Sequence, residues 1–77
     1  MKNRGKPILI EWIDSMSQSG WTRYSEADMR CTTVGHFYLE TDDRIVVAQN
    51  KCLDDENNYG DYMTIPKIVI KKRKWLK

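Results

Sequence analysis

The chain has 77 residues, which is enough for a single domain over residues 1–77 and too few for a second hydrophobic core. Its formal net charge is +2, but six basic residues and no acidic ones lie from Lys67 onward. Residues 1–66 therefore carry seven basic and eleven acidic side chains, a net of −4. This distribution argues against a duplex-binding protein with cations spread over one face. No apolar stretch approaches the roughly 20 residues that a membrane-spanning helix needs.

The two cysteines, Cys31 and Cys52, form no CxxC pair, so the ligand spacing of a zinc site is absent. The first residues are polar and Glu11 interrupts the apolar run that begins at Ile8, which is not the pattern of a signal peptide. We therefore expect a cytoplasmic protein with two free thiols. One disulfide between the two cysteines is the alternative. Small domains often need a metal, a disulfide or self-association for stability, and self-association stays open.

The first predicted strand covers residues 8–13, which are rich in β-branched and aromatic side chains. A polar stretch of Ser, Gln and Gly follows over residues 15–20 and predicts a loop. Ser25 and Asp28 have the spacing of a capping box, which predicts one short helical turn over residues 25–29.

Four further strands are predicted over residues 30–40, 44–50, 61–65 and 68–75. Gly35, in the middle of the second strand, indicates a bulge or bend where the sheet curls. The fourth strand is expected to end at Ile65, because Pro66 lacks the backbone donor of a ladder.

This order predicts an all-β fold, a small five-stranded antiparallel SH3-like or Sm-like barrel with one short helical turn. Closure into a barrel would remove the exposed edges of so small a sheet. A five-stranded OB barrel is the second choice, because that fold usually has a longer helix between strands three and four.

Catalysis is not expected. His36 is the only histidine, and no nucleophile motif flanks any serine. The acidic residues near Asp42 and Asp54 fall in predicted turns and lack the DxDxDG spacing of a calcium loop. We therefore expect no enzyme activity, no cofactor and no metal site.

The aromatic residues indicate binding. Trp12 shares a strand face with Ile8 and Ile10 and is assigned to the core. Trp21 follows the polar loop and lies near small hydroxyls, which suits stacking on a planar ligand such as a nucleobase. The alternative is that Trp21 closes the open end of the barrel. The residues grouped with Trp21 are Ser15, Ser17 and Tyr24.

The basic run from Lys71 to Lys74 has two interpretations. On a strand, no more than two of its four side chains project on one side. Such a strand is typical of a solvated edge protected against aggregation, although part of it could contact phosphate. Lys51 and Lys67, which follow the third and fourth predicted strands, are better placed for a single compact phosphate.

Several short motifs resemble a widespread group of small phage-encoded proteins. The matching segments are Ile10 to Asp14, Gly20-Trp21, Val34-Gly35, Ile45 to Ala48 and Thr64 to Lys67. The acidic loop from Asp54 to Gly60 and the basic run from Lys71 to Lys74 depart from that pattern. Among phage proteins of this size, the chain is similar to the anti-CBASS sponge proteins, which oligomerise and sequester cyclic dinucleotide signals.

The resemblance implies a phage anti-defence protein that binds and withholds a cyclic dinucleotide without degrading it. It also implies a homo-oligomer in the host cytoplasm, with the ligand held near subunit boundaries. Trp21 or a tyrosine would stack on a base, Ser15, Ser17 or Thr64 would bond its edges, and Lys51 or Lys67 would meet phosphate. The alternatives are a protein-interaction module that inhibits a host enzyme and a small single-stranded nucleic-acid-binding barrel.

Overall fold

The computed structural model describes residues 2–14 and 29–77, and within them the chain forms five β-strands and one short 3-10 turn. The prediction of an all-β fold is confirmed. None of the helical structure among these residues is long and apolar enough to cross a membrane. The elements are β1 (Pro7–Asp14), β2 (Met29–Glu40), β3 (Arg44–Lys51), β4 (Tyr59–Pro66), the 3-10 turn η3 (Lys67–Val69) and β5 (Ile70–Trp75).

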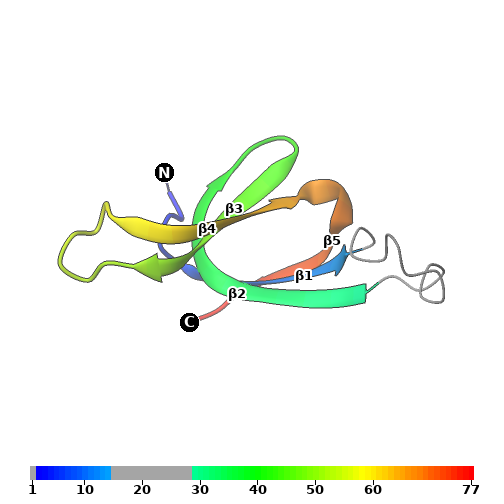
Figure 1. Ribbon diagram of the computed structural model, residues 1–77, viewed down its shortest axis with the longest axis horizontal. Helices are drawn as coiled ribbons and strands as arrows, with labels where there is room; N and C mark the ends of the chain where they lie inside the picture. Colours follow the sequence, from blue (N-terminus) through cyan, green and yellow to red (C-terminus); the bar gives the residue numbers. More distant parts are fainter. Residues whose placement is uncertain (1, 15–28) are drawn as a thin grey trace.

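All five strands belong to one antiparallel sheet with the order β4-β3-β2-β1-β5. The first three strands each pair with the next in sequence, and β5 returns to pair with β1. Figure 1 shows that β2, the central strand, bends strongly along its length, so the sheet is curved. The order leaves β4 and β5 as the two edges of the sheet, and closure into a barrel stays a prediction.

Each strand differs from its predicted range by one or two residues at one or both ends, and β4 begins at Tyr59 rather than residue 61. Pro66 was expected to end the ladder, and this is wrong: β4 continues through Pro66, which pairs with Arg44. Because β4 is an edge strand, a residue without a backbone donor can lie on its open side. The fifth strand begins at Ile70 rather than residue 68, because Lys67–Val69 forms η3. The helical turn predicted near Met29 falls mainly outside the described residues, and Met29 itself begins β2.

Apolar side chains from four strands form the core. Ile8 and Ile10 of β1 are completely buried, as the alternating pattern predicts. Trp12, on the same face, is half-buried and packs against the core, and its indole Nε1–H donates a 2.9 Å hydrogen bond to Thr33 Oγ1. The assignment of Trp12 to the core is therefore confirmed. The remaining buried members of the cluster are Phe37, Ile45, Val47 and Ile65.

Gly35 was predicted to mark a bulge or a bend, and β2 does bend along its length (Figure 1), but the bulge does not lie at Gly35. The register of the β2–β3 ladder shifts between Phe37 and Leu39, beyond Gly35. A Cβ atom at Gly35 would collide with the side chain of Val47 and lie 2.8 Å from the carbonyl oxygen of Ala48. Glycine is therefore required here because β3 approaches β2 closely.

Candidate functional site

A cleft with basic walls lies beside β5. Its volume is about 340 Å³, and it opens where the end of β2 and the start of β3 face η3 and β5. Four of its lining side chains are cationic, one is a carboxylate, and two are apolar. The lining residues are Glu40, Ile45, Lys67, Ile70, Lys71, Lys72 and Arg73.

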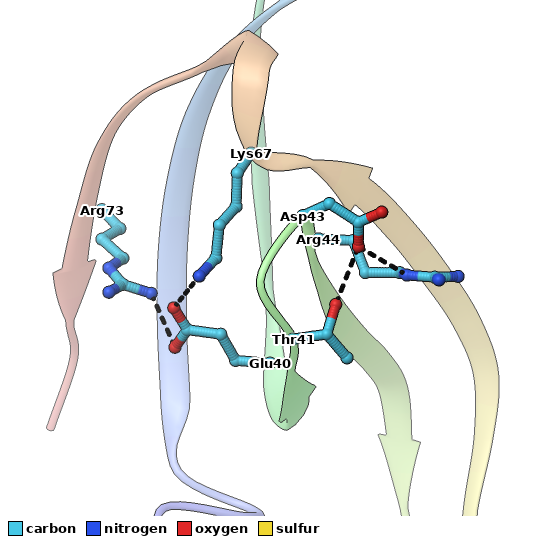
Figure 2. Close-up of polar contacts among 6 residues, drawn as sticks. All are labelled: Glu40, Thr41, Asp43, Arg44, Lys67 and Arg73. Carbon is cyan, nitrogen blue, oxygen red and sulfur yellow. Dashed lines mark hydrogen bonds and ion pairs between the residues drawn. The ribbon is translucent and has the colours of Figure 1, made fainter.

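Glu40 organises two of the four cations. Lys67 Nζ lies 2.7 Å from Glu40 Oε2, and Arg73 Nη1 lies 3.0 Å from Glu40 Oε1, so each carboxylate oxygen contacts one cation (Figure 2). The hydrogen bond from Lys67, followed by that from Arg73, lowers the pKa of Glu40 below its ordinary value of 4.5. With four cations and one carboxylate, the described residues of the cleft carry a net charge of +3 (4 − 1).

A bulge in β5 sets the direction of Lys71. In the β1–β5 ladder, Glu11 pairs with Lys72 and Trp12 pairs with Ile70, so Lys71 is the extra residue. Bulges redirect side chains out of the regular alternation of a strand. Lys71, Lys72 and Arg73 all border the same cleft, and the prediction that at most two cations of this run project on one side stays a prediction.

Lys71 also borders a second cavity. This cavity has a volume of about 510 Å³ and lies along the end of β1 and the start of β2. Its chemistry is mixed, with one aromatic ring, one thiol and charges of both signs. The lining residues are Glu11, Trp12, Ile13, Arg30, Cys31, Thr32 and Lys71.

The predicted site residues do not all come together. Lys67 lies in the basic cleft, whereas Lys51 pairs with Tyr59 at the opposite end of β4. Seven residue steps separate the two ends of this strand, or about 23 Å at roughly 3.3 Å per residue. Thr64 is exposed between them and pairs with Val46. The grouping of Lys51 and Lys67 around one compact phosphate is therefore wrong.

The other four candidates, Ser15, Ser17, Trp21 and Tyr24, lie outside the described residues. Their assignment to a stacking site stays a prediction. Glu40 and Arg73 were not among the candidates. Their contact joins residues 33 positions apart, and the sequence carries no local signal for it.

A tyrosine cluster forms a second surface feature, made of Tyr38, Tyr59 and Tyr62 with Arg4. Tyr38 contacts the other two rings edge to face, with centroid separations of 5.4 Å to Tyr59 and 4.8 Å to Tyr62. The Arg4 guanidinium lies 4.2 Å from the centroid of Tyr38, and its Nε–H donates to the Tyr38 carbonyl oxygen. Loss of hydration is the largest cause that raises the pKa of Tyr62, and hydrogen bonding to Tyr38 raises this pKa further. The cluster is therefore internally bonded.

The histidine and both cysteines lie within the described residues. His36 Nδ1 lies 3.1 Å from the carbonyl oxygen of Gly5, which can only accept, so this nitrogen acts as the donor. Cys31 and Cys52 are free thiols. Within residues 2–14 and 29–77, no group of three or more His, Cys, Asp or Glu side chains is arranged to hold a metal ion.

None of the three comparisons, with protein-family models, with curated proteins and with solved structures, gave a match to this chain. The functional argument therefore depends on the chemistry of the residues themselves. Of the features described, the basic cleft combines an open volume with surplus charge, and it is the candidate site.

Proposed function

We propose that the chain is a non-catalytic binding protein that holds an anionic nucleotide ligand in the basic cleft. The observation that carries this proposal is the placement of four cations and an apolar wall around one cavity. Nucleotides need such a combination, because phosphate seeks cations while the base seeks apolar contact. Within this class, the cyclic dinucleotide is the ligand that the resemblance to phage sponge proteins suggests.

The cations of the cleft divide into two pairs with different roles. Lys67 and Arg73 are held in place by Glu40, so their positions are set before a ligand arrives. Lys71 and Lys72 are exposed, and we assign them the first contact with phosphate. The half-buried side chain of Ile70 lies among them and offers an apolar contact for the base.

On this proposal the ligand is withheld rather than converted. A phage protein of this kind would lower the free concentration of a host signal in the cytoplasm and thereby blunt the host response. Trp21 remains the proposed stacking partner for a base, with Ser15, Ser17 and Tyr24 beside it.

The test is isothermal titration of the protein with a cyclic dinucleotide and, separately, with the matching mononucleotide. Charged hydrogen bonds are worth about 1.5–3 kcal/mol each, so Lys71→Ala and Lys72→Ala should each weaken binding about tenfold to a hundredfold. Lys51→Ala is the matched control, since it removes an exposed lysine at the far end of β4. Equal losses in all three variants, or no binding by the native protein, would refute the proposal.

A second measurement addresses turnover. After prolonged incubation the protein is denatured and the released ligand is analysed by mass spectrometry. We expect the cyclic dinucleotide to be recovered intact, because the described residues contain no nucleophile paired with a base. Linear products that disappear in a His36→Ala variant would instead identify an enzyme.

One observation favours single-stranded nucleic acid as an alternative ligand. Trp75 is 46% exposed on the same strand as Lys71 to Lys74, and exposed aromatics among cations are typical of base-stacking surfaces. Salt dependence separates the two ligands. A polynucleotide that contacts many phosphates should lose affinity steeply as salt rises, whereas a ligand with two phosphates should give a shallow slope.

A further inference from the structure

β5 is an edge strand of the sheet with a high density of positive charge. Among the described residues, β1 is the only strand that pairs with β5, so the other side of β5 has no ladder. The six residues of β5 include four cations and no acidic side chain. Because these charges lie along the strand itself, a chain that pairs with this edge meets them directly.

The hydrogen bonds to β1 show which backbone groups of β5 face outward. The Leu76 N–H donates a 2.9 Å hydrogen bond to the carbonyl oxygen of Pro7, just beyond the end of β5. In an antiparallel ladder, hydrogen-bonded pairs alternate with pairs whose backbone groups point away from each other. By the register, Lys74 therefore points its backbone groups toward β1, whereas Arg73 and Trp75 direct theirs to the open edge. Each of these two residues offers a donor and an acceptor there.

The side chains along this edge alternate between the two faces of the sheet. Arg73 and Trp75 pair with buried isoleucines of β1, so both lie on the core face. Arg73 is held there by Glu40 at 3.0 Å, and Trp75 is 46% exposed. Lys74 lies between them and projects from the opposite face. The edge therefore presents an exposed aromatic ring on one face and a cation on the other.

From these features we infer that β5 takes up an extended acidic segment of another protein as an additional strand. Backbone hydrogen bonds to Arg73 and Trp75 supply affinity, and side chains at alternate positions supply specificity. The segment that suits this edge has a carboxylate opposite Lys74 and an apolar residue opposite Trp75. A second β5 is unsuited, because its cations would face those of the first. A nucleic acid has no peptide groups with which to continue the ladder.

This partner differs in class from the proposed nucleotide and uses different groups of the protein. Lys74 and Trp75 lie outside the lining of the basic cleft. Their side chains, and the outward backbone groups of β5, are not the groups that we assign to phosphate. Failure of the segment to bind would therefore leave the proposed nucleotide binding untouched, and the reverse also holds.

Amide hydrogen exchange of the native protein, resolved by NMR, tests where the segment binds. The probe is a short peptide in which glutamate alternates with valine. In the free protein the amides of Arg73 and Trp75 should exchange fast, because they face solvent, whereas pairing with β1 protects the amide of Lys74. The peptide should remove the fast exchange at Arg73 and Trp75. Unchanged exchange at both amides in saturating peptide overturns the inference.

Two analogues of the peptide separate strand pairing from charge attraction. In the first, the valine nitrogens are methylated, which removes their hydrogen-bond donors and keeps every carboxylate. Each hydrogen bond lost in this way should weaken binding about twofold to tenfold. In the second, lysine replaces glutamate, and we expect no binding. Equal affinity for the glutamate peptide and its methylated analogue would show that charge alone attracts the peptide, and strand pairing would be refuted.

A pair of substitutions at Trp75 applies the same test to the protein. Both Trp75→Ala and Trp75→Pro remove the ring, but only proline removes the amide donor at the open edge. An edge strand tolerates proline where its N–H faces solvent, so circular dichroism should show an unchanged fold. Trp75→Pro should bind the glutamate peptide about twofold to tenfold more weakly than Trp75→Ala. Equal affinities contradict strand pairing, and the methylated peptide tests it on the native protein independently of how either variant folds.

The charge requirement is tested at Lys74, which is exposed. Lys74→Glu should bind the glutamate peptide about twofold to tenfold more weakly, because a like charge now lies opposite the carboxylate. Its nucleotide affinity should equal that of the native protein. Undiminished peptide binding by this variant would contradict the assigned register. A single-stranded oligonucleotide that binds this edge when the peptide does not would assign the edge to nucleic acid and overturn the inference.

Discussion

The basic cleft and the tyrosine cluster are both surface groups in which a charged residue organises its neighbours. They differ in how many of their charged groups have a partner within the group. In the cleft, Glu40 meets two cations while two more line the same cavity, which leaves a net charge of +3. In the tyrosine cluster, Arg4 is matched by the ring and the carbonyl oxygen of Tyr38. The first arrangement leaves charge available for a ligand, whereas the second uses its groups internally.

This difference indicates which group binds a ligand and which one stabilises the fold. Removing a member of the tyrosine cluster should reduce stability and leave nucleotide affinity unchanged. A change in the cleft should alter affinity more than stability. The four predictions that follow test this division, from the largest expected effect to the smallest.

Tyr38→Ala should destabilise the fold. It removes two aromatic contacts, each worth about 0.5–1.5 kcal/mol, so we expect a loss of about 1–3 kcal/mol in the free energy of unfolding. The measurement is urea denaturation followed by fluorescence. Nucleotide affinity of the folded variant should equal that of the native protein, and a loss of affinity at unchanged stability would reverse the roles of the two groups.

Glu40→Gln should strengthen nucleotide binding. It frees Lys67 and Arg73 from their carboxylate, and a close charge pair near the surface is worth roughly 1 kcal/mol, which corresponds to an affinity gain of about fivefold. The two lost ion pairs should lower stability by about 0.4–2 kcal/mol in total. Titration calorimetry and thermal unfolding measure both effects, and weaker binding by this variant would show that Glu40 itself contacts the ligand.

Lowering the pH should strengthen nucleotide binding and reduce stability in the native protein, as the Glu40→Gln change does. Because the pKa of Glu40 is lowered in the folded state, its contribution to stability is present above the unfolded value of 4.5 and is lost as pH falls through the folded value. Protonation in this range releases Lys67 and Arg73, so nucleotide affinity should rise below pH 4.5. Affinity of the Glu40→Gln variant, measured as the control, should lack this rise.

Tyr62→Phe should give the smallest effect. The hydroxyl of Tyr62 donates a 3.3 Å hydrogen bond to the Tyr59 carbonyl oxygen at an exposed position, so its loss should hardly change the melting temperature. In a spectrophotometric titration, the native protein should show a phenol with a pKa above the ordinary value of 10.0, and the variant should lack it. An unchanged titration curve would assign the raised pKa to another tyrosine.

Much of the fold could be predicted from the sequence because it depends on local patterns. The alternation of Ile8, Ile10 and Trp12 placed one face of β1 in the core, and the turn after Glu40 placed the β2–β3 hairpin. The concentration of basic residues from Lys67 onward was also visible in the composition of the sequence. In each case neighbouring residues carry the signal, and the period of a strand is enough to interpret it.

The site depended on contacts that no local pattern encodes. Glu40 meets Lys67 and Arg73 only because β5 returns to pair with β1 and brings the end of the chain beside the end of β2. The same pairing creates the bulge at Lys71, which breaks the alternation that the sequence predicts. The separation of Lys51 from Lys67 likewise follows from the length of β4. Sequence alone determined which side chains are available, and the tertiary structure decided which of them meet, because the register between distant strands sets those distances.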